Sequence, residues 1–173
     1  MSEPTLVKGT YEEALKMVGH STDVRFADVP IELGLIRAFT AMTEDANPTY
    51  WHKPTASELW DGLVAPPGLL TCLFMPMPWR PDGAVDRTVL GALVPLPGST
   101  TINVSGEFTF FRPLRVGDWL NVVETVNSIS PEKTTRLGVG HFVTTTAIYR
   151  DGEGGIVAEG ISTMFRFDPA EAA

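Results

Sequence analysis

Alternating apolar and polar residues in the second half of the chain predict a β-sheet. Between Ile102 and Phe110, apolar side chains occupy every even-numbered position except Gly106, and polar side chains occupy the odd-numbered positions. A period of two places the apolar side chains on one face of a strand. Three further strand-like runs follow, separated by turns rich in Pro, Gly or charged residues, over residues 120–129, 137–149 and 156–167. Short turns between successive strands are typical of an antiparallel sheet.

Helical spacing dominates the first half of the chain. Pro30 suits the first position of a helix, and Leu35, Phe39 and Met42 follow at positions i, i+4 and i+7 of one apolar face. This pattern predicts a helix from Pro30 to about Thr43. Three shorter elements are also expected in this half: a helix over residues 11–18, an extended piece over 24–29 and a helix over 54–60.

An uncharged apolar segment, residues 62–79, joins the two halves. Its prolines would repeatedly break a membrane helix, so the sequence predicts a buried segment and no membrane association. Apolar residues surround the helix expected over residues 67–75, which predicts burial on all sides. The following loop, residues 76–100, is long enough to cover a site or a partner. One sheet and one apolar helix predict a single α+β domain, residues 1–173, in which the sheet curls around the helix.

Composition narrows the function classes. The 173 residues are 43% apolar and 20% charged, which favours a packed core. Asp and Glu outnumber Lys and Arg by 21 to 13, for a net charge of −8, and no basic cluster interrupts that balance. Because nucleic-acid binding requires such a cluster, no nucleic-acid partner is expected. The N-terminus lacks a basic and then apolar leader, so a cytoplasmic location is expected.

The chain offers little for a metal or a redox cofactor. One cysteine, Cys72, cannot form an internal disulfide framework or a Cys-rich zinc site. No Gly-rich phosphate loop, metal-ligand spacing or nucleophile signature is present. The sequence therefore predicts no cofactor and no metal.

Three motifs, in this order and spacing, resemble those of MaoC-like hydratases and dehydratases. Residues 45–50, DANPTY, are similar to the catalytic loop of that family, and residues 65–68, APPG, to the start of its central helix. Residues 111–118, FRPLRVGD, resemble its strand-end turn. The Ala-Pro-Pro form, with Tyr in the loop, looks most like the FAS1-like dehydratase branch and the partner subunits of (3R)-hydroxyacyl dehydratases. The resemblance runs from about Glu32 to Phe167.

The resemblance implies a hot-dog fold, an antiparallel sheet wrapped around a central helix. It also implies a hydro-lyase of lipid metabolism, which hydrates a trans-2-enoyl thioester or dehydrates a 3-hydroxyacyl thioester. That reaction needs one group to take the α-proton, one to protonate the hydroxyl, and N–H donors for the enolate-like oxygen. The family supplies an Asp and a His on one loop and a Gly N–H at the start of the central helix.

Carried over to this chain, the resemblance gives three candidate catalytic residues: Asp45, Tyr50 and His52. Asp45 matches the family Asp, but Tyr50 stands at the His position, and a phenol is a poorer proton shuttle at neutral pH than an imidazole. His52, two residues further on, is the obvious substitute. Each has a structural alternative, because Asp45 also suits a turn and His52 a surface loop.

The start of the central helix departs from the family as well. Pro66 and Pro67 replace the His-Gly of active members, and proline has no N–H to donate. Gly68 or Leu69 would have to donate instead, one residue displaced. The candidate substrate-binding residues are therefore Asn47, Pro67, Gly68 and Leu69, together with Trp79 where the long loop begins.

Two departures from one mechanism favour a subunit that does not carry the main chemistry. We expect an acyl-binding half of an (R)-specific enoyl-thioester hydratase or 3-hydroxyacyl-thioester dehydratase, paired with a second hot-dog chain as a dimer or tetramer. The substrate would be a thioester of CoA or of acyl-carrier protein. Two alternatives stay open: a homodimeric enoyl-CoA hydratase that uses Asp45 with His52 or Tyr50, and a non-catalytic binder of a bulky acyl or polycyclic thioester.

Overall fold

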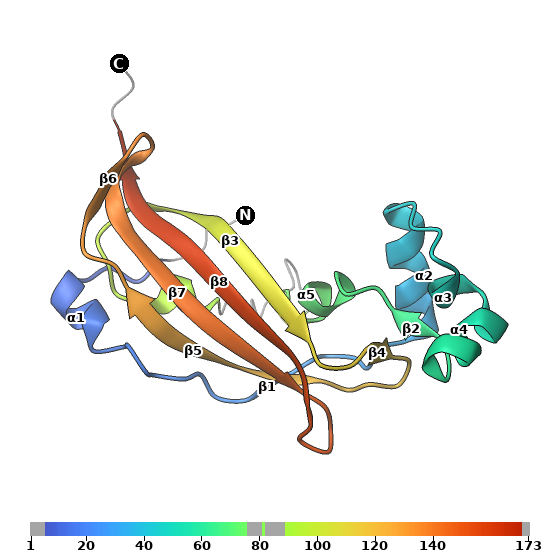
Figure 1. Ribbon diagram of the computed structural model, residues 1–173. Helices are drawn as coiled ribbons and strands as arrows, with labels where there is room; N and C mark the ends of the chain where they lie inside the picture. Colours follow the sequence, from blue (N-terminus) through green and yellow to red (C-terminus); the bar gives the residue numbers. More distant parts are fainter. Residues whose placement is uncertain (1–5, 76–80, 82–88, 171–173) are drawn as a thin grey trace.

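A computed structural model of the chain, which describes residues 6–75, 81 and 89–170, consists of an antiparallel sheet with helices beside it and beyond one end (Figure 1). The strands of the main path lie in the order β1-β5-β7-β8-β3, and β6 pairs with β7. Their bounds are β1 Arg25–Phe26, β3 Thr100–Phe110, β5 Asn121–Ile129, β6 Lys133–Thr135, β7 Gly138–Arg150 and β8 Ile156–Pro169. The four predicted long strands are confirmed.

One predicted turn contains a strand. Within residues 113–118, β4 (Leu114–Arg115) pairs antiparallel with β2 (Val64–Ala65), which directly precedes the Pro-Pro motif. Leu114, Val64 and Ala65 are all buried. The start of the helix at residue 69 is therefore tied to the strand-end turn by a small second sheet.

The helices are short, and among the described residues no helix is long and apolar enough to cross a membrane. Their bounds are α1 Tyr11–Leu15, α2 Leu33–Met42, α3 Pro48–Trp51, α4 Lys53–Trp60, α5 Leu69–Leu73 and α6 Leu90–Leu93. The predicted start of α2 at Pro30 is wrong. Ile31 donates its N–H to the Asp118 carbonyl (2.9 Å) and accepts from the Gly117 N–H (2.8 Å), so this stretch is held against the strand-end turn.

Two clusters of buried side chains form the core. The larger joins α2, Tyr50 and α5 to the sheet; its main members are Ile36, Leu69, Leu70, Phe74, Leu120, Val122, Tyr149 and Val157. The smaller joins α1 and α6 to β5 and β7; it contains Ala14, Leu90, Val94, Leu96, Val126, Ile129 and Val143. The helical segment α2–α4 lies beyond one end of the sheet (Figure 1).

The central helix is shorter and more exposed than the sequence predicts. Leu69 and Leu70 are buried, whereas Thr71 and Cys72 on the other face are exposed. The prediction of burial on all sides is therefore wrong. Thr and Cys are small enough to be compatible with a core, so the sequence pattern does not separate the two faces.

A buried arginine on β8 links the N-terminal segment to the segment that precedes β3. Arg166 of β8 is 1% exposed, and its guanidinium donates hydrogen bonds to four backbone carbonyls. These belong to Val7, Val94, Leu96 and Gly98, at distances of 2.8 to 3.5 Å. A buried charge is tolerated when its donors are satisfied in this way. Arg166 thus fixes the N-terminal segment and the chain that leads into β3.

Replacing Arg166 should unfold the protein more easily. R166M keeps the apolar stem but orphans the carbonyls, so we expect the free energy of unfolding to fall by about 3 kcal/mol. Urea denaturation followed by circular dichroism measures the loss. The exposed Arg136 provides a matched control, R136M, with an expected change below about 0.5 kcal/mol. Equal losses for the two variants would contradict the role of Arg166.

Candidate functional site

The candidate loop begins where α2 ends. The Asp45 N–H donates to the Thr40 carbonyl (2.9 Å) and the Glu44 N–H to the Ala41 carbonyl (3.4 Å), which together close the helix in a Schellman motif. Glu44 takes the left-handed conformation, with φ of 53°, at a position where glycine is usual. This closure fixes Asp45 as the first residue of the loop. Because residue 44 is Glu and not Gly, the sequence does not signal this helix end.

Asp45 and Asn47 organise the loop itself. Asp45 Oδ1 accepts the Asn47 N–H at 3.0 Å, as in an Asx turn. Asn47 Oδ1 in turn accepts the Thr49 N–H (3.1 Å) and the Thr49 hydroxyl (2.9 Å), and so caps α3, in which Pro48 takes the first position. Both side chains therefore perform the turn and capping roles that the sequence left open for Asp45.

Tyr50 points into the protein. Its side chain is 8% exposed and belongs to the larger core cluster, beside residues of α2 and α5. Burial raises the pKa of the Tyr50 phenol, the Asp45 charge raises it further, and the Asn47 side chain opposes both. A phenol with a raised pKa stays protonated at neutral pH, so Tyr50 can donate a hydrogen bond but cannot act as a base.

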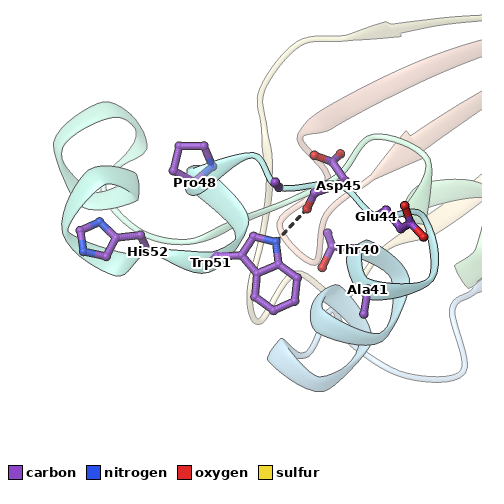
Figure 2. Close-up of a pocket in the computed structure, with 8 residues that line it drawn as sticks. Thr40, Ala41, Glu44, Asp45, Pro48, Trp51 and His52 are labelled. Atoms are coloured by element: carbon purple, nitrogen blue, oxygen red, sulfur yellow. Dashed lines mark hydrogen bonds between the residues drawn. The ribbon is translucent and has the colours of Figure 1, made fainter.

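His52 lies at the junction of α3 and α4, where its Nδ1 pairs with the Thr55 hydroxyl at 2.8 Å. Trp51 lies between it and Asp45, and donates its indole N–H to the Asp45 carbonyl at 2.8 Å. Asp45 and His52 both border a hollow of about 450 Å³ at the end of α2. Figure 2 shows, however, that the His52 ring is directed away from Asp45. The structure places them on one loop without bringing their side chains together.

The start of α5 leaves one N–H available. Leu69 donates its N–H to the Pro66 carbonyl at 3.0 Å, so it does not serve as a free donor. Pro67 is exposed and has no N–H. The Gly68 N–H donates no hydrogen bond within the part of the chain that the structure describes. Of the two donors considered from the sequence, Gly68 is the one that the geometry retains.

α2 connects the two parts of the candidate site. A Cβ atom at Gly68 would lie 2.9 Å from Phe39 Cζ, so the α5 start packs directly against α2. The same helix ends at the Asp45 loop. The remaining predicted site residue, Trp79, lies outside the described residues. Trp51, which is not among the predicted site residues, is signalled only by its position as the third residue after the Asn-Pro pair.

The described residues contain no group of three His, Cys, Asp or Glu side chains that could hold a metal ion. What the loop offers chemically is one half-buried carboxylate, one buried phenol and one imidazole that faces elsewhere.

Comparison with known proteins gives the following matches. Residues 16–160 match the family described as FAS1-like, dehydratase domain region. A probable enoyl-CoA hydratase alpha subunit from Thermomonospora curvata is 34% identical over 169 residues, which cover 92% of this chain and 52% of that protein. The chain thus spans about half the length of this curated relative.

Solved structures show the same fold. A chain of the ChsH1-ChsH2 complex from Mycobacterium tuberculosis superposes with a TM-score of 0.78 at 22% identity, covering 93% of this chain and 97% of that one. The MaoC-like dehydratase from Rhodospirillum rubrum gives a TM-score of 0.64 at 22% identity, covering 90% and 94%. The predicted α+β hot-dog fold is confirmed.

The buried phenol can be tested by titration. Because the pKa of Tyr50 is raised in the folded protein, its ionisation should occur above the ordinary tyrosine value of about 10. The unfolded chain then releases this proton first, so stability should decline as the pH rises through that range, and Y50F should remove part of the decline. Ultraviolet absorbance of tyrosinate measures the ionisation. If the step lost in Y50F titrates below about 10, the assigned environment is wrong.

Proposed function

Since the chain belongs to the FAS1-like dehydratase domain family, we propose that it is the acyl-binding subunit of an (R)-specific enoyl-thioester hydratase or 3-hydroxyacyl-thioester dehydratase. In this arrangement a second hot-dog chain supplies the Asp and His that move protons. This chain contributes its scaffold, part of the acyl-binding surface and the Gly68 N–H.

The observation that carries the proposal is the position of Tyr50. It stands where active relatives of the resembled family have the proton-shuttling His, and its side chain is buried in the core with a raised pKa. Proton transfer by a positioned side chain works best when its pKa lies near the working pH. The raised pKa of the Tyr50 phenol keeps it protonated near neutral pH, so it cannot accept a proton there. The His52 imidazole pairs with the Thr55 hydroxyl.

Asp45 supports the same conclusion. Its carboxylate accepts a hydrogen bond from the Asn47 N–H, and its carbonyl accepts one from Trp51. These contacts hold the loop, and in the described structure no His side chain faces the carboxylate. A carboxylate without an orienting imidazole lacks one of the two groups that hydration of an enoyl thioester requires.

The edge of the sheet supports a protein partner. β3 is an edge strand of 11 residues and pairs only with β8 among the described strands. Ile102, Val104 and Phe108 of this strand are 36–51% exposed. A long edge strand with exposed apolar side chains is a surface that pairing with another chain would cover. One of the structural relatives is a chain of the two-protein ChsH1-ChsH2 complex, which is consistent with a second subunit for this chain as well.

The self-sufficient homodimer is less well supported, because the His52 ring is directed away from Asp45 and the buried Tyr50 phenol has a raised pKa. The non-catalytic binder uses the same scaffold and differs only in the absence of turnover with any partner. Both remain distinguishable from the proposed function by one set of assays.

The chain alone should not hydrate crotonyl-CoA. We expect turnover to appear when a hot-dog chain that carries the family Asp and His, and that co-purifies with this one, is added, with a gain of about a thousandfold. Hydration measured by loss of the enoyl absorbance checks this.

Asp45→Asn in the isolated chain is the matched control. Robust turnover by the isolated chain that D45N abolishes would refute the proposal in favour of the homodimer. Tight binding of an acyl-CoA without turnover in any pairing would favour the non-catalytic binder.

A further inference from the structure

A second hollow lies on elements that do not carry the Asp45 loop. It has a volume of about 610 Å³ and is bordered by β1, β5, α6 and the residues that precede β1. This volume falls within the range of small-molecule sites in proteins. The hollow is therefore large enough for a ligand of its own.

Glu124 places a polar group between the two parts of the core. It lies on β5 between Val122, a member of the larger cluster, and Val126, a member of the smaller one, and alternation along the strand puts all three on one face. Its Oε2 accepts the Leu90 N–H at 3.4 Å. Burial raises the pKa of the Glu124 carboxyl, against the opposing effects of Leu90 and Arg25. A carboxyl group is thus held at the border of the hollow, where the apolar core is interrupted.

Arg25 and Tyr149 flank this carboxyl. The Arg25 guanidinium lies 5.6 Å from the centre of the Phe74 ring, at the end of α5. Tyr149 packs against Phe74 with ring centres 5.3 Å apart, and burial together with the Glu124 charge raises its pKa to about 12. The cluster therefore combines a cation, an acidic group and a protonated phenol, with hydrogen-bond donors and acceptors close together.

The rest of the border is largely apolar. Apolar side chains make up half of the lining: Val24, Phe26, Leu90, Leu93 and Val122. Phe26 is 61% exposed and Val24 53% exposed, which is apolar surface that the described residues do not cover. An apolar ligand body would bury this surface.

The charges select the ligand's polar group. Arg25 would repel a cationic head group, whereas Glu124 and Asp23, which also lines the hollow, would repel an anionic one. A neutral group that both donates and accepts a hydrogen bond suits the mixed cluster. We propose that this hollow binds an apolar molecule that carries a neutral hydroxyl group, with the hydroxyl at Glu124 and Arg25 and the apolar body against Phe26 and Val24.

Direct binding to the isolated chain tests the site without any need for turnover. Isothermal titration calorimetry would compare decan-1-ol, decanoate and decyltrimethylammonium. We expect decan-1-ol to bind and both charged probes to bind at least about tenfold more weakly. Equal or tighter binding of either charged probe, or no binding of decan-1-ol, would overturn the proposal.

Substitutions locate the site. E124L should raise the Kd for decan-1-ol about tenfold, and E124Q, which keeps a hydrogen-bonding group, less than about threefold. Glu132 is exposed in a turn, and E132L should leave the Kd unchanged. Because Phe26 is exposed, F26A tests the same site without opening the core, and we expect it to weaken binding at least about threefold. An unchanged Kd in F26A, or equal effects of E124L and E132L, would overturn the assignment.

Discussion

The burial of Tyr50 fixes the loop on which the candidate site depends. Its side chain belongs to the larger core cluster, which contains residues of α2, α5 and the sheet, while the Asn47 cap and the bond from Trp51 to the Asp45 carbonyl hold the residues on either side. Truncating an aromatic side chain that is packed in a core lowers the free energy of unfolding by about 3–5 kcal/mol. The position that would carry a shuttle in the resembled family is here part of the hydrophobic core.

Because Tyr50 is buried, its loop can help to position a substrate without transferring protons. The scaffold keeps the elements of the proposed thioester site: the closed end of α2, the loop, and a Gly at the start of α5 that packs on Phe39. Within the described structure, however, the His52 imidazole is directed away from Asp45. Among the described strands β3 pairs only with β8, and this partly apolar edge is where the proposed second chain would have a place to bind. The residues of this loop thus stabilise the fold, and the proposed second chain carries the proton transfer.

The strands could be predicted because they rest on local signals, the alternation along β3 and the turns between successive runs, and the Asn-Pro pair made a turn role one of the two alternatives for Asp45. The start of α2 could not, since Ile31 is held by Asp118 and Gly117, far along the chain. The left-handed conformation of Glu44 and the exposure of Cys72 could not be predicted either. Glu does not signal a left-handed backbone, and Cys is compatible with a buried position. The direction of His52 and the depth of Tyr50 depend on packing between distant elements, which no local pattern encodes.

The most direct test places the same substitution in each half of the complex. With this chain and the proposed catalytic partner purified together, kcat for enoyl-CoA hydration would be measured with Asp→Asn in the loop of one chain at a time. The account predicts that D45N in this chain changes kcat by less than about threefold, while the partner's substitution lowers it about a thousandfold. A thousandfold loss from D45N, with the partner's substitution tolerated, would contradict it.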